Sequence, residues 1–309
     1  MSKTPHILIA GANPAWDRTL IFERFVPGAV NRASIIKEFA AGKGINAARA
    51  IATWRQATST VVQFAGGEWG EKLLVRLVAD DIANRTVKTA ASTRSCTTCI
   101  DNSGNMTELI DPSAPPSAGE IAEYMAAFAE LAPAADGYLA AGTAPGGSTG
   151  EFYSLLAREI ERCPKTLLLD APVEADKLIN SGLVTCLKVN LAEACAIANC
   201  APENLYERLA CLPIPIVAIT NGAEEAFILT SAGRWRYRLP ALKAVVSPLG
   251  AGDAAAGVMM TELLRGTEPQ EAFKFALAAA SASTLNIFCG HFPVVDAAQI
   301  YSQIEIEEF

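Results

Sequence analysis

The sequence predicts an α/β fold in which helices cover both faces of a mainly parallel sheet. Along most of the 309 residues, short apolar runs of strand length alternate with helical patterns. Hydrophobic residues make up 51% of the chain and charged residues 19%, which provides enough apolar material for a large core. No fixed-period repeat or flexible linker divides the sequence. We therefore expect a single domain over residues 1–309.

The N-terminal part of the sequence predicts more strands than one parallel sheet can hold. A buried strand at 7–10 is followed by a turn-rich segment at 13–17. The next expected elements are strands at 19–26, 33–39 and 60–64, a helix at 45–54, and a hairpin over 95–110 that turns at 101–104. Because the extra strands cannot all join a parallel sheet, we expect a small β lid. It is formed by about 14–40 and 92–112 and closes over a ligand.

The remainder of the sequence alternates more regularly. Helices are expected at 119–131, 149–161, 173–180, 191–211, 252–265 and 269–287. Strands are expected at 137–141, 166–170, 184–189 and 214–219, with a hairpin of 225–230 and 234–239. Helical crossovers between parallel strands lie on the faces of the sheet, so this alternation is typical of a sheet covered on both sides.

Charge and hydropathy narrow the classes of partner. The formal net charge of −8 gives no general attraction to nucleic acid or anionic membranes, so an anionic substrate needs specific lysines or arginines. The apolar run at 7–10 is too short for the core of a signal peptide. No stretch approaches the roughly 20 apolar residues of a membrane span. We expect a cytoplasmic protein that acts on small molecules, with neither nucleic acid nor membrane as a partner.

The cysteines and histidines indicate neither a disulfide framework nor a metal site. Eight cysteines are scattered along the chain, and Cys96 and Cys99, which have C-x-x-C spacing, have no second pair nearby. His6 and His291 lie at opposite ends of the sequence without acidic residues at metal-ligand spacing. A serine hydrolase would also need an elbow such as G-x-S-x-G, which the sequence lacks.

The densest chemical signal is a glycine-rich turn, Gly250-Ala251-Gly252-Asp253, that opens the helix expected at 252–265. Glycines let the backbone approach phosphate oxygens closely, and the first-turn N–H groups of a helix stabilise negative charge. Asp253 is either a helix N-cap, a metal-binding group or an acceptor of a proton from an attacking hydroxyl. The tetrapeptide alone does not decide between these roles. No Walker-type P-loop is present.

Several segments together resemble the ribokinase-like, or PfkB, carbohydrate kinases. The segments are Asn13-Pro14-Ala15-Trp16-Asp17, Val30-Asn31-Arg32, Ala41-Gly42-Lys43-Gly44-Ile45-Asn46-Ala47-Ala48-Arg49, Lys188-Val189-Asn190-Leu191-Ala192-Glu193 and Gly250-Ala251-Gly252-Asp253. They occur in the order in which the family has them. The resemblance covers nearly the whole chain and is greatest to the branch that holds 1-phosphofructokinase, tagatose-6-phosphate kinase and the minor 6-phosphofructokinase.

The resemblance implies a ribokinase-like three-layer α/β/α fold with a small β-stranded lid. It also implies a kinase that transfers the γ-phosphoryl group of ATP, with Mg²⁺, to a primary hydroxyl of a ketohexose phosphate. The candidate acceptors are fructose 1-phosphate, fructose 6-phosphate and tagatose 6-phosphate. In this interpretation Asp253 is the general base, and the backbone amides of Gly250, Ala251 and Gly252 form an anion hole. Glu193, together with Asn190, positions the metal through its waters.

Other site residues follow from the same resemblance. Sugar recognition is assigned to Asp17, Gly42, Lys43, Asn46 and Thr143, and the phosphate already on the sugar to Arg32, Lys43 and Arg94. Nucleotide binding is assigned to Lys188, Asn190, Thr220, Gly222 and Asn286. A monovalent cation would be held by backbone carbonyls around 247–249 and 286–290. Apolar lid residues such as Phe22 and Phe25 would allow a homodimer through the lid.

Some residues depart from the family pattern and leave alternatives open. Glu225 stands where the family usually has a second glycine near the nucleotide, and Ala41 replaces the first glycine of the G-G-K-G segment. One alternative is a kinase of an unphosphorylated sugar or a nucleoside, for which Arg32 and Arg94 are incidental. The other is a non-catalytic protein of the same fold that binds a sugar phosphate or a nucleotide. Such a binding protein has no need for a general base at Asp253.

Overall fold

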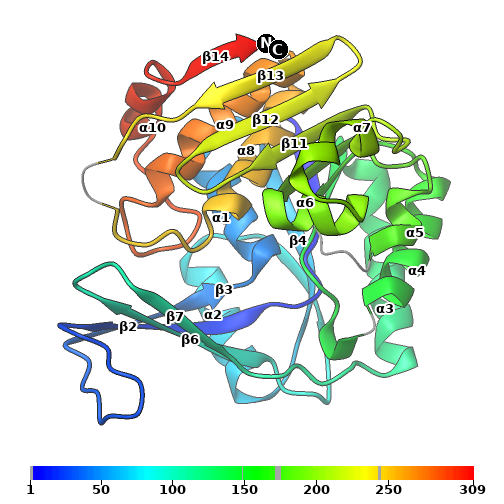
Figure 1. Ribbon diagram of the computed structural model, residues 1–309. Helices are drawn as coiled ribbons and strands as arrows, with labels where there is room; N and C mark the ends of the chain where they lie inside the picture. The colour runs from blue at the N-terminus through cyan, green and yellow to red at the C-terminus, as the bar shows by residue number, and fades with distance from the viewer. Residues whose placement is uncertain (1–2, 148, 171–174, 243–244) are drawn as a thin grey trace.

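The computed structural model describes residues 3–147, 149–170, 175–242 and 245–309, and a ten-stranded sheet runs through it (Figure 1). The strand order is β14-β13-β12-β11-β10-β9-β8-β1-β4-β5. The strands are β1 His6–Ala10, β4 Thr58–Ala65, β5 Asn84–Lys88, β8 Gly137–Ala141, β9 Thr166–Asp170, β10 Cys186–Asn190, β11 Ile216–Thr220, β12 Glu225–Thr230, β13 Gly233–Arg238 and β14 Glu305–Glu308. From β5 to β11 neighbouring strands pair in parallel, and from β11 to β14 they pair antiparallel.

Helices cover both faces of this sheet, and the predicted three-layer fold is confirmed. One face carries α1 Lys43–Trp54, α2 Gly67–Ala79, α8 Ala251–Leu264, α9 Pro269–Ser283 and α10 Val294–Tyr301. The other carries α3 Ala118–Leu131, α4 Thr149–Arg162, α5 Asp176–Ile179, α6 Leu191–Ala198 and α7 Leu205–Leu209. Short 3₁₀ turns occur at Ala132–Ala134, Pro145–Gly147 and Pro202–Asn204.

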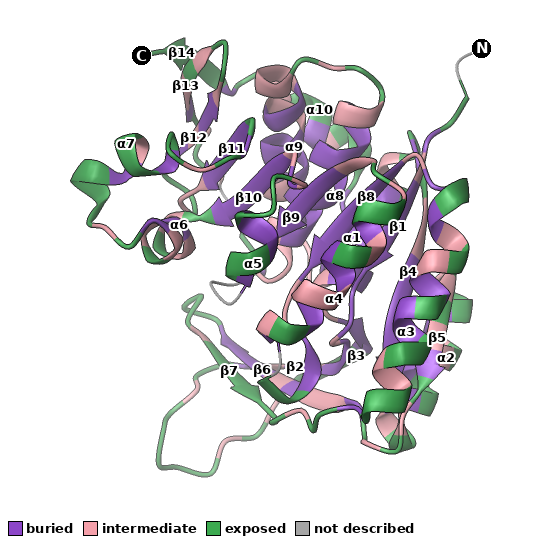
Figure 2. Cartoon of the chain, turned by 90° about the vertical axis from the view of Figure 1, so that its right-hand side faces the viewer, coloured by how far each residue is buried: buried purple, intermediate pink, exposed green. Residues whose placement is uncertain are grey.

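Alternate residues of each strand enter separate hydrophobic cores on the two faces of the sheet. In β1, Ile7 and Ile9 join the core beneath α1 and α8, whereas Leu8 and Ala10 join the core beneath α3 and α4. This follows from the two-residue period of a strand. Figure 2 shows that the strands are mostly buried while the outward faces of the helices are exposed. Helices shield both faces of the central strands from water, which explains why the sequences of these strands are continuously apolar.

A separate four-stranded sheet, the small sheet, lies against one edge of the molecule (Figure 1). It consists of β2 Ala15–Phe22, β3 Ile35–Ala41, β6 Arg94–Asp101 and β7 Met106–Ile110, in the order β3-β2-β6-β7. The hairpin predicted over 95–110 is confirmed as β6 and β7. The strand predicted at 19–26 instead begins at Ala15 and ends at Phe22, so Asp17 is a strand residue and not a turn residue.

The sequence analysis missed α2, β5, α10 and β14. The two strands have weak apolar patterns, because β5 buries only Val87 and β14 buries no residue. The helix α2 does bury an apolar stripe with Leu73 and Leu77, which the sequence analysis overlooked. The helix predicted over 269–287 ends earlier, at Ser283, after which Thr284 N–H bonds back to the carbonyl of Ser281. The helix predicted over 173–180 begins at residues that lie outside the described part of the chain. In the described residues, none of the helices combines the length and the apolar character that a membrane crossing requires.

Candidate active site

The candidate site lies where the carboxyl ends of the central parallel strands meet the first turn of α8. The chain leaves β1 toward β4 on one side, and it later returns to β8 on the other side of β1. Ligands of open α/β sheets bind at such a switch point, outside the carboxyl ends of the strands. Here those ends supply Asn13 after β1, Gly142 after β8, Asp170 from β9 and Asn190 from β10. The small sheet lies beside this edge (Figure 1).

The first turn of α8 is shaped to leave its amides accessible. Gly250 has a φ of 76°, and a Cβ at this position would lie 2.6 Å from the Cβ of Cys289, so only glycine fits. The amides of Gly252 and Asp253 belong to the first turn, whose N–H groups have no acceptor within the helix. A Cβ on Gly252 would lie 2.9 Å from Nζ of Lys188. Donors and a cation therefore converge on this turn, as the anion-hole interpretation expects.

Asp253 is buried at this turn and does not cap the helix. The N-cap is Gly250, and no side chain bonds to the free amides, so the alternative that Asp253 is only an N-cap is wrong. Its Oδ2 accepts a hydrogen bond of 2.8 Å from Nδ2 of Asn46. Burial raises the pKa of Asp253, the charge of Asp170 raises it further, and Lys43 and Asn46 offset only part of this effect. A carboxylate with a raised pKa is a better proton acceptor near neutral pH.

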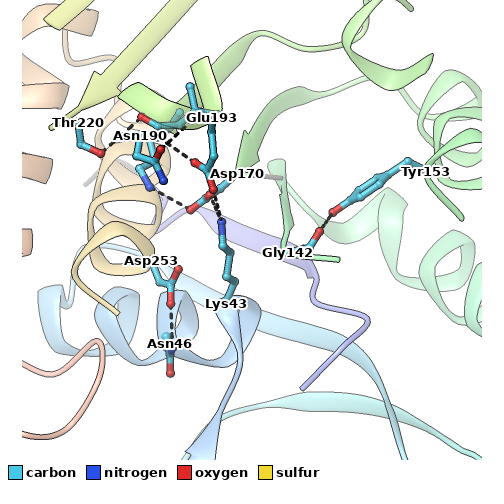
Figure 3. Close-up of polar contacts among 11 residues, drawn as sticks. Lys43, Asn46, Gly142, Tyr153, Asp170, Asn190, Glu193, Thr220 and Asp253 are labelled. Atoms are coloured by element: carbon cyan, nitrogen blue, oxygen red, sulfur yellow. Dashed lines mark hydrogen bonds and ion pairs between the residues drawn. The ribbon is translucent and has the colours of Figure 1, made fainter. Parts of the chain in front are cut away.

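Asp170, which the sequence analysis missed, connects two lysines of the site (Figure 3). Its Oδ1 lies 2.8 Å from Nζ of Lys43 and its Oδ2 lies 3.2 Å from Nζ of Lys188. Burial alone would raise the pKa of Asp170, but the ion pairs with Lys188 and Lys43 outweigh it and lower the pKa. Burial likewise disfavours charged Lys43, yet the carboxylates of Asp170, Asp253 and Glu193 raise its pKa overall. Lys43 is therefore held charged beside the turn.

The Asn-x-x-Glu segment forms a capping box at the start of α6. Oδ1 of Asn190 accepts from the amide of Glu193 at 2.8 Å, and Oε2 of Glu193 accepts from the amide of Asn190 at 2.9 Å. The other oxygen of Glu193 lies 3.7 Å from Nζ of Lys43. In the part of the chain that the structure describes, no group of three or more His, Cys, Asp or Glu side chains could hold a metal. This arrangement fits Mg²⁺ that is held mainly by water and phosphate oxygens, with Glu193 beside it.

A cavity of about 250 Å³, the acceptor cavity, adjoins this network. Its lining includes Asn13, Lys43, Arg94, Thr143 and Glu193. Nη2 of Arg94 donates to the carbonyl of Asn13 at 3.3 Å, whereas its buried Nε has no hydrogen-bond partner among the described residues. Nδ2 of Asn13 donates to Oγ1 of Thr143 at 3.0 Å. The cavity thus combines two cationic side chains with neutral polar groups, which suits a ligand carrying both an anion and hydroxyls.

Asp17 and Gly42 form the boundary between the small sheet and α1. Asp17 is buried, and it accepts hydrogen bonds from Thr19 at 2.8 Å and Thr98 at 3.4 Å. Burial raises its pKa to about 6, although the two hydroxyls oppose this shift. Gly42 has a φ of 109°, and a Cβ there would lie 2.8 Å from Cα of Pro14. Glycine is therefore required where β3 turns into α1.

The structure does not bring every predicted residue to the acceptor cavity. Arg32 is exposed in the loop between β2 and β3, beyond the end of β2 that is distant from Asp17. Thr220 ends β11, and Gly222 follows it in a turn with a positive φ. Both polar atoms of the Asn286 side chain are hydrogen-bonded within the protein. Its Oδ1 accepts from the backbone amide of Phe288, and its Nδ2 donates to the carbonyl of His291. Asn286 therefore shapes the loop that follows α9.

Glu225, which replaces a glycine of the family pattern, forms ion pairs with the neighbouring strand. Its carboxylate lies 3.6 Å from Nε of Arg236 and 3.5 Å from Nε of Arg238, both on β13. The charge of Glu225 is therefore paired across the β12–β13 hairpin. The sequence alone did not reveal this, since the pairing depends on the register Glu225–Arg238.

Comparisons with known proteins agree with this geometry. The profile described as "pfkB family carbohydrate kinase" matches residues 12–293. Tagatose-6-phosphate kinase of Staphylococcus epidermidis is 24% identical, and the alignment covers 98% of this chain and 99% of that relative. Phosphofructokinase-2 of Escherichia coli, solved in a tetrameric inhibited form, has a TM-score of 0.85 at 24% identity, over 97% of this chain and 99% of that one. A possible 1-phosphofructokinase of Thermotoga maritima has a TM-score of 0.84 at 20% identity, over 98% and 99%.

Proposed function

The chain belongs to the pfkB family of carbohydrate kinases, and on this premise we propose that it phosphorylates a ketohexose phosphate. As a member of this family it is a phosphotransferase with an alcohol group as acceptor. The γ-phosphoryl group of ATP would pass to a primary hydroxyl of fructose 1-phosphate, fructose 6-phosphate or tagatose 6-phosphate. A relative named tagatose-6-phosphate kinase and a similar structure solved with fructose-6-phosphate support this choice of acceptors.

The observation that carries the proposal is the state of Arg94 in the acceptor cavity. Its Nε is buried without a partner among the described residues, and Lys43 lines the same cavity. A buried guanidinium nitrogen without an acceptor is costly unless a ligand supplies one. A phosphate on the sugar supplies such an acceptor and can bind a guanidinium through two hydrogen bonds. An unphosphorylated sugar or nucleoside would offer this cationic group only neutral oxygen acceptors, which bind it more weakly than a phosphate does.

The remaining residues provide the chemistry of phosphoryl transfer. Asp253 accepts the proton of the attacking hydroxyl while Asn46 fixes the orientation of its carboxylate. The first-turn amides of α8, together with Lys188, stabilise the charge on the transferring group. Asp170 remains ionised and holds both lysines in place. These groups act mainly by positioning and by neutralising charge.

Metal ions complete this assignment. Mg²⁺, brought with ATP, would be held beside Glu193 and Asn190 and would neutralise charge on the phosphates. A similar structure was solved with potassium, which supports a monovalent cation bound by backbone carbonyls around 247–249 and 286–290. The carbonyl of Cys289 already accepts a hydrogen bond of 2.8 Å from Arg49. A cation at this place would therefore use other carbonyls of the two segments.

The small sheet is proposed to act as the lid and to join two copies of the chain. Its strand β2 carries Asp17, the residue assigned to the sugar hydroxyls, which supports this role as a lid. Phe22 contributes little to such a contact, because only 6% of it is accessible and it packs against Phe25. Large exposed apolar side chains on the small sheet are instead Ile35, Ile36, Leu109 and Ile110. They provide the apolar surface that a homodimer through the lid would bury.

An acceptor screen with MgATP tests the proposed function. ADP release is measured with the three ketohexose phosphates, with fructose and with adenosine, for the wild type, Arg94→Gln and the control Arg85→Gln. Arg85 is exposed, and Glu130 is its only ion-pair partner in the described part of the chain. Losing a hydrogen bond to a charged phosphate should lower kcat/KM for the sugar phosphate by about 10- to 100-fold in Arg94→Gln, with the KM for MgATP unchanged.

Two results would contradict the proposal. Preferred turnover of fructose or adenosine, with undiminished activity of Arg94→Gln, would support the kinase of an unphosphorylated acceptor. Calorimetric binding of a sugar phosphate without ADP release from any acceptor would support the non-catalytic binding protein.

A further inference from the structure

A second, larger cavity lies apart from the acceptor cavity, at the end of α1. Its volume is about 730 Å³, within the range of small-molecule binding sites, and its lining residues do not overlap with those of the acceptor cavity. We call it the arginine cavity, after its lining residues Arg49, Arg55 and Arg76, which surround Asp80. Neither the family motifs nor the proposed mechanism uses Arg55, Arg76 or Asp80.

The charges of the arginine cavity do not cancel. Arg49 and Arg76 both pair with Asp80, at 3.3 and 2.8 Å. Arg55 forms no ion pair with any described residue and is exposed. Three guanidinium groups therefore surround one carboxylate, in a chain whose net charge is −8. A concave site with excess positive charge attracts anions.

The backbone at Arg55 adds a separate observation. Arg55 is the C-cap of α1 and has a φ of 60°, in the left-handed region. Glycine or asparagine is usual in this conformation, because other side chains are strained there. The side chain of Arg55 forms no ion pair with a described residue that would offset this strain. It does place a guanidinium group in the lining of the cavity.

The lining also contains an aromatic side chain that is only half-buried, Phe288. Phe288 packs edge-to-face on the buried ring of Phe39, with ring centroids 5.7 Å apart. We propose that the arginine cavity binds a phosphate monoester whose body is an aromatic ring. The guanidinium groups of Arg55 and Arg76 bind the phosphate through paired hydrogen bonds, and Phe288 packs against the ring.

The arginine cavity is connected to the proposed general base by two hydrogen bonds. Nη1 of Arg49 donates to Oδ1 of Asn46 at 3.3 Å, and Nδ2 of Asn46 donates to Asp253 at 2.8 Å. A phosphate that competes with Asp80 for the guanidinium groups changes the contacts of Arg49 and, through them, the orientation of Asn46. Because Asn46 is also assigned to sugar recognition, occupancy should lower kcat/KM for the sugar phosphate and leave the KM for MgATP unchanged. This kinetic effect rests on the proposed kinase function, whereas binding of the phosphate monoester to the arginine cavity does not.

Calorimetric titration of the full-length protein with phenyl phosphate tests the proposal. Phenol and inorganic phosphate each carry half of the recognised chemistry and should bind at least about tenfold more weakly. The central variant is Arg55→Asn, because asparagine tolerates the left-handed backbone while the charge is removed. It should weaken phenyl phosphate binding by about tenfold or more without lowering the Tm. Arg94→Gln and Arg85→Gln should bind phenyl phosphate as the wild type does.

The opposite results would overturn the proposal. If phenyl phosphate binds Arg55→Asn normally but not Arg94→Gln, it occupies the acceptor cavity instead. Inorganic phosphate binding as tightly as phenyl phosphate would refute the role of Phe288. Absence of any phenyl phosphate binding at millimolar concentration would refute the site as a whole, even in a protein that is an active kinase.

Discussion

The end of β9 and the first turn of α8 each carry a buried aspartate, and the two carboxylates differ in their partners. Asp170 contacts the ammonium groups of Lys43 and Lys188, and its pKa is lowered. Asp253 has a hydrogen bond from the neutral amide of Asn46, and its pKa is raised. Burial is similar in both regions, so the direct partners decide the direction. The difference is consistent with the proposal that Asp253 transfers the proton while Asp170 holds the lysines.

This comparison predicts opposite effects on stability. For Asp170, whose folded pKa is lowered, ionisation stabilises the folded state above the unfolded pKa, and this is lost as the pH falls through the folded pKa. For Asp253, whose folded pKa is raised, the ionised form destabilises the folded state at neutral pH. Replacing the carboxylate of Asp170 should therefore lower the free energy of unfolding, whereas replacing that of Asp253 should not.

The largest expected effect on stability is that of Asp170→Asn. The substitution leaves Lys188 buried without its counter-ion and removes the closest partner of Lys43. Breaking a buried ion pair in this way costs about 3–5 kcal/mol, to be measured by urea unfolding at neutral pH. Glu130→Gln, which removes an exposed ion pair with Arg85, is the matched control. A loss no larger than that of this control would contradict the role given to Asp170.

Asp17 extends the comparison to the small sheet and predicts an intermediate effect. Its pKa is raised to about 6, so at pH 7.5 its charge destabilises the fold. Asp17→Asn should raise the free energy of unfolding by about 1–3 kcal/mol at pH 7.5, and the gain should shrink as the pH falls below about 6. Unfolding measured from pH 4.5 to 8 checks this, and a gain independent of pH would be inconsistent with it.

The raised pKa of Asp17 also predicts how sugar binding depends on pH. Protonation removes an acceptor for the sugar hydroxyls, so the wild-type kcat/KM for the sugar phosphate should fall as the pH drops through about 6. Asp17→Asn should have a low kcat/KM and lack this titration.

The smallest effect, on both stability and the KM for MgATP, is expected for Glu225→Gln. The carboxylate is partly exposed and paired with Arg236 and Arg238, and such surface pairs contribute about 0–1 kcal/mol. The KM for MgATP should stay within about twofold of the wild-type value, because the carboxylate is already paired with two arginines. A marked decrease of this KM would show that Glu225 does repel the nucleotide. Steady-state kinetics with varied MgATP distinguish the two outcomes.

The sequence predicted those parts of the site that lie in dense local motifs. Asp253, Lys43 and Asn46 each stand in the first turns of a helix that follows a glycine-rich segment, so motif and position coincide. Asp170 has no such motif. It ends the apolar strand Thr166–Asp170, and only its place at the carboxyl edge of the sheet reveals it. An acidic residue directly after a fully buried strand was the signal that could have identified it.

Other differences arise where packing, not local pattern, decides. Arg32 belongs to a family segment, yet it lies in a loop beyond the end of β2 that is remote from Asp17. The sequence does not specify where this loop lies. The pairing of Glu225 depends on strand register across a hairpin. Elements with few buried residues, such as β14, carry too little apolar pattern to be recognised.

The most direct test of the account is the turnover number of Asp253→Asn at saturating MgATP and sugar phosphate, using the acceptor that the screen identifies. We predict that kcat falls by about 10²- to 10⁴-fold, because the hydroxyl loses its proton acceptor, while the Tm is not lowered. A kcat close to that of the wild type, from correctly folded protein, would contradict the assignment of Asp253 as the general base.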